Sequence, residues 1–160
     1  MLKKINYKLL IICILIPEIV GFISNLLSNG AMKNYNELKH PPFSPPGWVF
    51  VVVWSILYLL MGISLYLIIS SHYYPVDMKK AAFLFFAVQL LFNFMWSIVF
   101  FKYELRFNAF LLILVIIVFT VMTIAAFYQI SKPAGILLIP YALWLFYASY
   151  LNYYTWLINR

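Results

Sequence analysis

The chain has 160 residues, of which 66% are hydrophobic and only 9% are charged, and its formal net charge is +7. A soluble domain carries about 25% charged residues, so this composition excludes a water-soluble globular fold and indicates one domain embedded in a membrane. The positive charge does not indicate a nucleic-acid partner, because the lysines and arginines flank apolar segments instead of forming a basic surface.

The first predicted element is an apolar helix at about residues 7–27. This run is longer than the 7–15 apolar residues of a signal peptide, and no Ala-x-Ala cleavage site follows it, so we expect a retained membrane-spanning helix. Glu18 lies in its middle and is either a functional carboxylate or a protonated group bonded to a neighbour. Cys13 is the only cysteine, which excludes an intrachain disulfide and a cysteine-based metal site.

A polar connection at about residues 28–45 follows and contains the turn signal Asn29-Gly30. Pro41–Pro46 holds four of the eight prolines, so we expect an ordered lid in place of a flexible linker. We predict Ser44 as the N-cap of the next helix, with Pro45 and Pro46 in its first turn.

Four more apolar helices are predicted from the remaining sequence, at about residues 46–70, 78–101, 107–129 and 134–158. Each is close to the roughly 20 residues that cross a bilayer, whereas a barrel would need strands of about ten residues with alternating polarity. Pro140 should bend the last helix, because proline removes one backbone hydrogen bond. The predicted fold is therefore an all-α, five-helix membrane bundle.

Aromatic and amide side chains recur on single faces of three of these helices. Trp54, Tyr58 and Met61 share one face, and Gln89, Asn93, Trp96 and Ser97 share another. The last helix places Tyr141, Trp144, Ala148, Leu151 and Asn152 together. Such faces either join helices to each other or line a ligand site, and the spacing alone leaves both interpretations open.

Three ordered blocks of aromatic residues carry a resemblance to a known family. They are Tyr35-x-x-Leu38-x-x-Pro41-x-x-x-Pro45-Pro46-x-Trp48-Val49-Phe50-x-x-x-Trp54-x-x-Leu57-Tyr58-x-x-Met61-Gly62, Asn93-x-x-Trp96-Ser97-x-x-Phe100-Phe101 and Pro140-Tyr141-x-x-Trp144-x-x-x-Ala148-x-x-Leu151-Asn152. This pattern resembles the TspO/MBR family of translocator proteins, from about residue 35 to the C-terminus. The sequence departs from the family at Asn34 and Phe43, where tryptophan is common, and at Leu157, where animal members carry a base in a sterol motif.

The resemblance implies a pocket under the proline-rich loop that binds a flat apolar ligand, with the tetrapyrroles protoporphyrin and haem as the expected class. The expected ligand-binding residues are Tyr35, Trp54, Tyr58, Gln89, Asn93, Trp96, Tyr141, Trp144, Ala148 and Asn152. Trp54 and Trp144 are also the candidate catalytic residues, as redox-active walls facing each other. No metal site and no required cofactor are expected, and His40 and His72 are not expected to be axial ligands of haem.

Several functions remain open at this point. The resemblance implies a porphyrin sensor or regulator, with a light- and oxygen-dependent porphyrin-degrading enzyme and a porphyrin or sterol transporter as alternatives. It also implies a homodimer in a bacterial cell membrane, in contact with membrane lipid. No hydrolase triad or nucleotide-binding loop is visible, and no repeated halves support transport.

Overall fold

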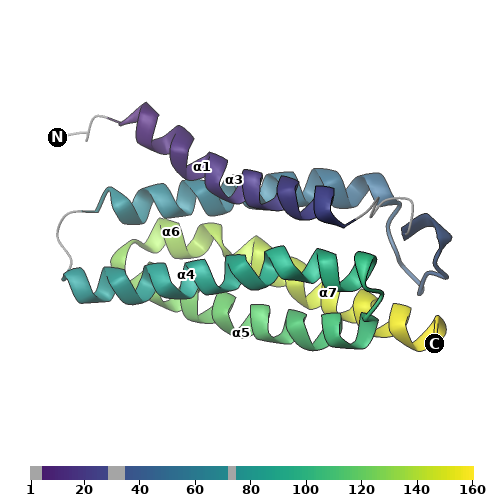
Figure 1. Cartoon of the computed structure of the whole chain (residues 1–160). Helices are drawn as coiled ribbons and strands as arrows, with labels where there is room; N and C mark the ends of the chain where they lie inside the picture. Colours follow the sequence, from purple (N-terminus) through teal and green to yellow (C-terminus); the bar gives the residue numbers. More distant parts are fainter. Residues whose placement is uncertain (1–4, 29–34, 72–74) are drawn as a thin grey trace.

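The computed structural model describes residues 5–28, 35–71 and 75–160. Within these ranges, five helical spans run side by side in one bundle (Figure 1), and each is long and apolar enough to cross a membrane. No strand occurs in the described ranges. The predicted all-α, five-helix membrane fold is confirmed, while the turn predicted at Asn29-Gly30 and His72 lie outside the described residues.

The elements in chain order are α1 (Tyr7–Leu27), α3 (Gly47–Ile69), α4 (Val76–Ser97), the π-helical turn η1 (Ile98–Lys102), α5 (Arg106–Ile130), α6 (Lys132–Leu137) and α7 (Ile139–Ile158). The third span consists of α4 continued by η1, and the fifth span consists of α6 followed by α7. Helix α1 packs against α3 and α4, α3 packs against α6, and α5 packs against both α4 and α7.

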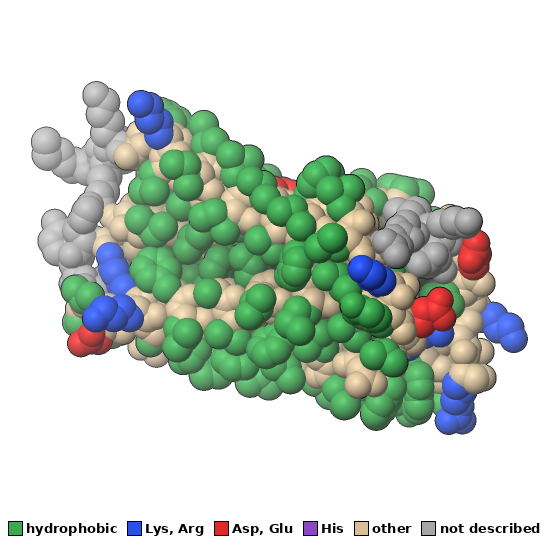
Figure 2. Space-filling model, in the orientation of Figure 1, with side chains coloured by type: hydrophobic (Ala, Val, Ile, Leu, Met, Phe, Trp, Pro, Cys, Tyr) green, Lys and Arg blue, Asp and Glu red, His purple; other side chains and the backbone are tan. Residues whose placement is uncertain are grey.

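Hydrophobic side chains cover most of the visible face of the bundle, and Lys, Arg, Asp and Glu gather mainly at its two ends (Figure 2). Large apolar residues such as Ile11, Leu91 and Val118 are more than half exposed, although they lie inside the long helices. Such exposure is unfavourable in water but suits lipid tails, which are as apolar as these side chains. The structure therefore places a continuous apolar surface along the length of the spans.

Helix α3 begins later than the proline-rich sequence predicts. Its N-cap is Pro46, in extended backbone with φ −62° and ψ 150°, and no side chain caps the helix. The prediction of Ser44 as N-cap is wrong. Pro45 precedes a proline, and that position disfavours the helical region of backbone conformation, so Pro45 stays outside the helix, which starts at Gly47. The Ser44 backbone N–H donates instead to the carbonyl of Pro41, at 3.3 Å.

The fifth span is interrupted where the sequence predicts a distortion. Helix α6 ends at Leu137 and α7 begins at Ile139, with Pro140 in its first turn. Pro140 has no N–H to donate, and its ring would clash with the carbonyl of Ile136 in a continuous helix. The predicted bend is therefore confirmed, and it turns the chain from α6, which packs against α3, into α7.

Helices α1 and α3 cross in direct backbone contact at Gly62. A Cβ atom added to Gly62 would lie 2.4 Å from the Ile14 Cα and 2.8 Å from the Cys13 carbonyl oxygen. Cys13 itself is 1% exposed, as expected for a small packed side chain. The absence of a side chain at Gly62 therefore sets how closely α1 approaches the bundle.

We expect Gly62→Ala to destabilise the protein by about 1–3 kcal/mol, because the new methyl group would push the two backbones apart. Helix propensity alone predicts the opposite sign, since alanine is more favourable than glycine by about 1 kcal/mol. Thermal unfolding in detergent micelles measures the difference. Ala87→Val enlarges an exposed side chain of α4 and should leave the midpoint unchanged. A Gly62→Ala midpoint at or above that of the wild type would contradict the packing described.

Candidate functional site

A cavity of about 290 Å³ lies between α1, α3, α4 with η1, and α7. It occupies the end of the bundle nearest the proline-rich loop, and Tyr35 of that loop contributes to its wall. The wall combines aromatic rings with a few amides and hydroxyl groups. Such a composition is typical of sites for flat, mostly apolar ligands with a small number of polar groups.

Seven of the ten residues predicted to bind ligand line this cavity. They are Tyr35, Trp54, Tyr58, Asn93, Trp96, Ala148 and Asn152. They come from the loop, α3, α4 and α7, so helices far apart in the sequence bring the three predicted blocks to one place. Whether they contact a ligand stays a prediction.

The other three predicted residues, Gln89, Tyr141 and Trp144, do not line the cavity. Gln89 and Tyr141 are 1% and 0% exposed and lie behind its floor. Trp144 packs edge-on against Phe50, with ring centroids 5.8 Å apart, and it is Phe50 that reaches the cavity wall. The structure therefore does not bring Trp54 and Trp144 face to face across the cavity. Trp144 instead forms a layer behind Phe50.

A chain of buried hydrogen bonds closes the deep end of the cavity. The Tyr58 hydroxyl donates to the Asn93 Oδ1 (2.9 Å), and the Asn93 Nδ2 donates to the Tyr141 hydroxyl (2.8 Å). The Tyr141 hydroxyl in turn donates to the Gln89 Oε1 (3.0 Å). This chain joins α3, α4 and α7, and it confirms that both amides point into the bundle and not toward lipid.

A second pair of hydrogen bonds joins the cavity-wall residues Trp96 of α4 and Asn152 of α7, and links Asn152 to α5. The Trp96 indole N–H donates to the Asn152 Oδ1 (3.0 Å), and the Asn152 Nδ2 donates to the Arg106 carbonyl (2.8 Å). Just beyond Trp96, α4 widens into the π-helical turn η1, where the Tyr103 N–H donates to the Ile98 carbonyl (3.1 Å). Turns of this kind are frequent at functional sites, and this one directs Phe100 and Phe101 to the cavity.

The described part of the predicted lid, residues 35–45, is held against the end of α7. The Tyr147 hydroxyl donates to the Phe43 carbonyl (2.7 Å), and the Asn159 Nδ2 donates to the Lys39 carbonyl (2.9 Å). Tyr35 donates its hydroxyl proton to the Pro45 carbonyl (2.8 Å), and burial raises the pKa of this phenol, which keeps the proton in place. Phe43 has a φ of 65°, a left-handed conformation that is uncommon outside glycine.

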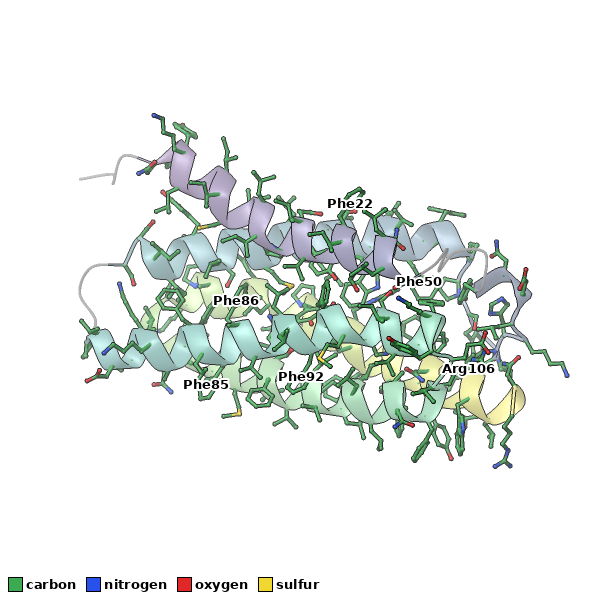
Figure 3. All side chains as sticks on the ribbon, in the orientation of Figure 1. Phe22, Phe50, Phe85, Phe86, Phe92 and Arg106 are labelled. Atoms are coloured by element: carbon green, nitrogen blue, oxygen red, sulfur yellow. The ribbon has the colours of Figure 1, made fainter. Side chains whose placement is uncertain are left out.

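Sequence reasoning missed the contribution of α1. Glu18, Gly21 and Asn25 line the cavity at i, i+3 and i+7, together with Phe22 and Ser24. Their helical spacing is the signal that could have identified this face. Figure 3 shows Phe22 on α1 and Phe50 nearer the loop end of the bundle.

The described residues contain no group of three or more His, Cys, Asp or Glu side chains that could hold a metal ion. His40 packs against the ring of Tyr35, with centroids 4.3 Å apart, and is not among the described residues that line the cavity. The site is therefore built from stacking surfaces and hydrogen-bonding groups.

Comparison with known proteins matches residues 13–157 to the TspO/MBR family. The chain is 36% identical over 145 residues to the tryptophan-rich protein TspO of Chlorobaculum tepidum, covering 90% of this chain and 91% of that protein. It is 33% identical over 125 residues to the tryptophan-rich sensory protein of Cereibacter sphaeroides, covering 78% and 76%. It is also 32% identical over 150 residues to the translocator protein of Bos taurus, covering 91% and 87%.

Removing the Tyr141 hydroxyl should destabilise the bundle, because it leaves the Asn93 Nδ2 and the Gln89 Oε1 without partners. We expect Tyr141→Phe to lower the free energy of unfolding by about 1–2 kcal/mol. Unfolding in micelles measures this change. Tyr128→Phe removes a hydroxyl from a side chain that is 46% exposed and should have no measurable effect. Equal stability of the two variants would show that the buried hydrogen bonds of Tyr141 contribute nothing to the free energy of unfolding.

Tyr147→Phe should loosen the loop, because it removes the donor to the Phe43 carbonyl while keeping the ring. Phe43 is 87% exposed, so we expect chymotrypsin to cleave after it several times faster in the variant. Tyr154→Phe serves as the matched control, since the structure records no bond from its hydroxyl to the described part of the loop. An unchanged cleavage rate in Tyr147→Phe would mean that other contacts hold the loop.

Proposed function

The chain belongs to the TspO/MBR family of membrane proteins, and on this basis we propose that it binds a flat tetrapyrrole, such as protoporphyrin or haem, in the cavity beneath the loop. We further propose that it acts as a sensor or regulator of that ligand. The relatives named as a tryptophan-rich sensory protein and as translocator proteins support a role of this general kind.

The observation that carries the proposal is the aromatic cavity wall. Trp54, Trp96 and Phe50 come from two different helices and line the same space. Aromatic rings attract flat conjugated ligands in offset-stacked or edge-on geometries. The amides of Asn93 and Asn152 add polar groups between these rings, which suits a macrocycle with polar atoms at its centre and edge.

The size of the cavity adds a condition on how a macrocycle would bind. A volume of about 290 Å³ lies at the lower end of the range for small-molecule sites, which is about 300–1,000 Å³. Phe22 and Val51 line the cavity although they are 64% and 57% exposed, so the cavity reaches the outer surface between α1 and α3. A tetrapyrrole would therefore fill the interior and extend past these two side chains toward the lipid.

Light- and oxygen-dependent degradation of the bound porphyrin is the second candidate function. Trp54 favours it, because this oxidisable indole lies at the cavity wall with the Tyr58 ring 5.4 Å away between centroids. Trp144 does not line the cavity, so a direct redox role is assigned to Trp54 alone. Transport of a porphyrin or sterol, a homodimeric assembly and a bacterial cell membrane location remain proposals that rest on the family.

Substitutions of Trp54 test both functions. Loss of a stacking surface costs about 1–3 kcal/mol in comparable aromatic sites, so Trp54→Ala should weaken protoporphyrin binding by roughly fivefold to 150-fold. Trp54→Phe keeps most of the stacking area and should weaken binding less. If the protein degrades the ligand, Trp54→Phe should slow photobleaching much more than it weakens binding, because phenylalanine is far harder to oxidise than indole.

Tryptophan fluorescence quenching gives the affinity, and the absorbance of the bound porphyrin under illumination gives the degradation rate. Trp48→Phe is the control, since Trp48 belongs to the same helix but is 66% exposed and does not line the cavity. Unchanged affinity in Trp54→Ala would refute the binding site. Loss of porphyrin absorbance at the same rate with and without protein would refute degradation and leave the binding proposal intact.

A further inference from the structure

Glu18 occupies an unusual position in the wall of the cavity. It lies near the middle of α1 (Tyr7–Leu27), a helix long enough to span the membrane. Among the described residues that line the cavity, it is the only Asp, Glu, Lys, Arg or His. A carboxyl group at membrane depth is unfavourable unless it faces a partner or a water-filled space, so its presence requires an explanation.

The described part of the protein supplies no partner for this carboxyl group. Within the described ranges, no hydrogen bond or ion pair joins Glu18 to another residue. Gly21, three residues further along α1, approaches α3 so closely that an added Cβ would lie 2.1 Å from the Tyr58 Cε2. Helix α1 is thus pressed against the Tyr58 ring, and Glu18 lies one turn before this contact.

Several donors in the cavity wall bond to other parts of the protein instead of to Glu18. Tyr58 donates to Asn93, and Trp96 donates to Asn152. On the α1 side, the Ser24 hydroxyl donates to the Phe94 carbonyl at 2.6 Å. Since no described residue donates to Glu18, a ligand in the cavity could supply its hydrogen-bond donor.

We propose that Glu18 is a specificity-determining residue that discriminates flat ligands by their peripheral substituents, favouring a hydrogen-bond donor or a cationic nitrogen and disfavouring a carboxylate. The inference rests on the proposed function, since it assumes that a flat ligand occupies this cavity. A cationic nitrogen beside the carboxylate stabilises the ionised form and makes a charge-assisted hydrogen bond. In the absence of a lysine, arginine or histidine among the described lining residues, a ligand carboxylate at the same place would be repelled.

This arrangement orients the ligand as well as selecting it. An edge that carries acidic groups is directed away from Glu18, toward the loop and the outer surface near Phe22. An edge without acidic groups, or one whose substituents carry a donor or cationic nitrogen, is directed inward, against α1. The cavity therefore discriminates between two porphyrins of the same ring size by the charge of their side chains.

The test compares two probes with the same macrocycle. One is protoporphyrin IX, whose two propionates are anionic, and the other is its bis-amide with 1,2-diaminoethane, whose chain ends are cationic. Binding to the full chain in nanodiscs of zwitterionic lipid is measured by tryptophan quenching for the wild type and for Glu18→Gln. We expect Glu18→Gln to shift the ratio of the two dissociation constants by about tenfold in favour of protoporphyrin IX.

The ratio is informative because a general loosening of the cavity would change both affinities together. Asp77→Asn removes the same charge from a 94% exposed side chain at the start of α4, far from the loop, and should keep the wild-type ratio. An unchanged ratio in Glu18→Gln, or an equal shift in Asp77→Asn, would overturn the role of Glu18 while leaving the proposed function standing. If the wild type binds neither probe saturably, both the proposed function and this inference are refuted.

Discussion

Hydrogen-bonding groups inside a lipid bilayer must find partners within the protein, and this constraint organises the bundle. The series of hydrogen bonds from Tyr58 through Asn93 and Tyr141 to Gln89 satisfies this requirement with side chains from α3, α4 and α7. A shift of any of these helices by one residue would leave buried polar atoms unpaired. The same bonds that fix the register of the three helices therefore also form the floor of the cavity.

Two local departures from regular helix shape the bundle. Pro140 breaks the fifth span into α6, which packs against α5 and α3, and α7, which packs mainly against α5. At the loop end of the bundle, η1 widens the third span, and its Phe100 and Phe101 line the cavity. The proline-rich loop, bonded to Tyr147, lies at the end of this space.

Much of this could be predicted from the sequence, because lipid makes the apolar spans and their buried amides conspicuous. Gln89 and Asn93 share a face through their i, i+4 spacing, and both are buried as expected. Helical periodicity, however, predicts which face of a helix a side chain occupies, but not how far that side chain lies from the cavity. It could not show that Phe50 stands between Trp144 and the cavity, nor that the Pro45-Pro46 step delays α3 to Gly47. The wall formed by α1 depends on a crossing at Gly62 that no local pattern specifies.

The attachment of α1 has a consequence for the response to bilayer thickness. Its second half is fastened by the close contact of Gly21 with Tyr58 and by the hydroxyl bonds of Ser24 and Ser28, the latter to Ser97 at 2.7 Å. Its first turns diverge from α4 (Figure 1). Hydrophobic mismatch is commonly relieved by tilting or bending of a span. In this molecule the turns of α1 before Cys13, where α1 meets Gly62 of α3, would absorb that adjustment, and the cavity would keep its width in thin and thick membranes alike.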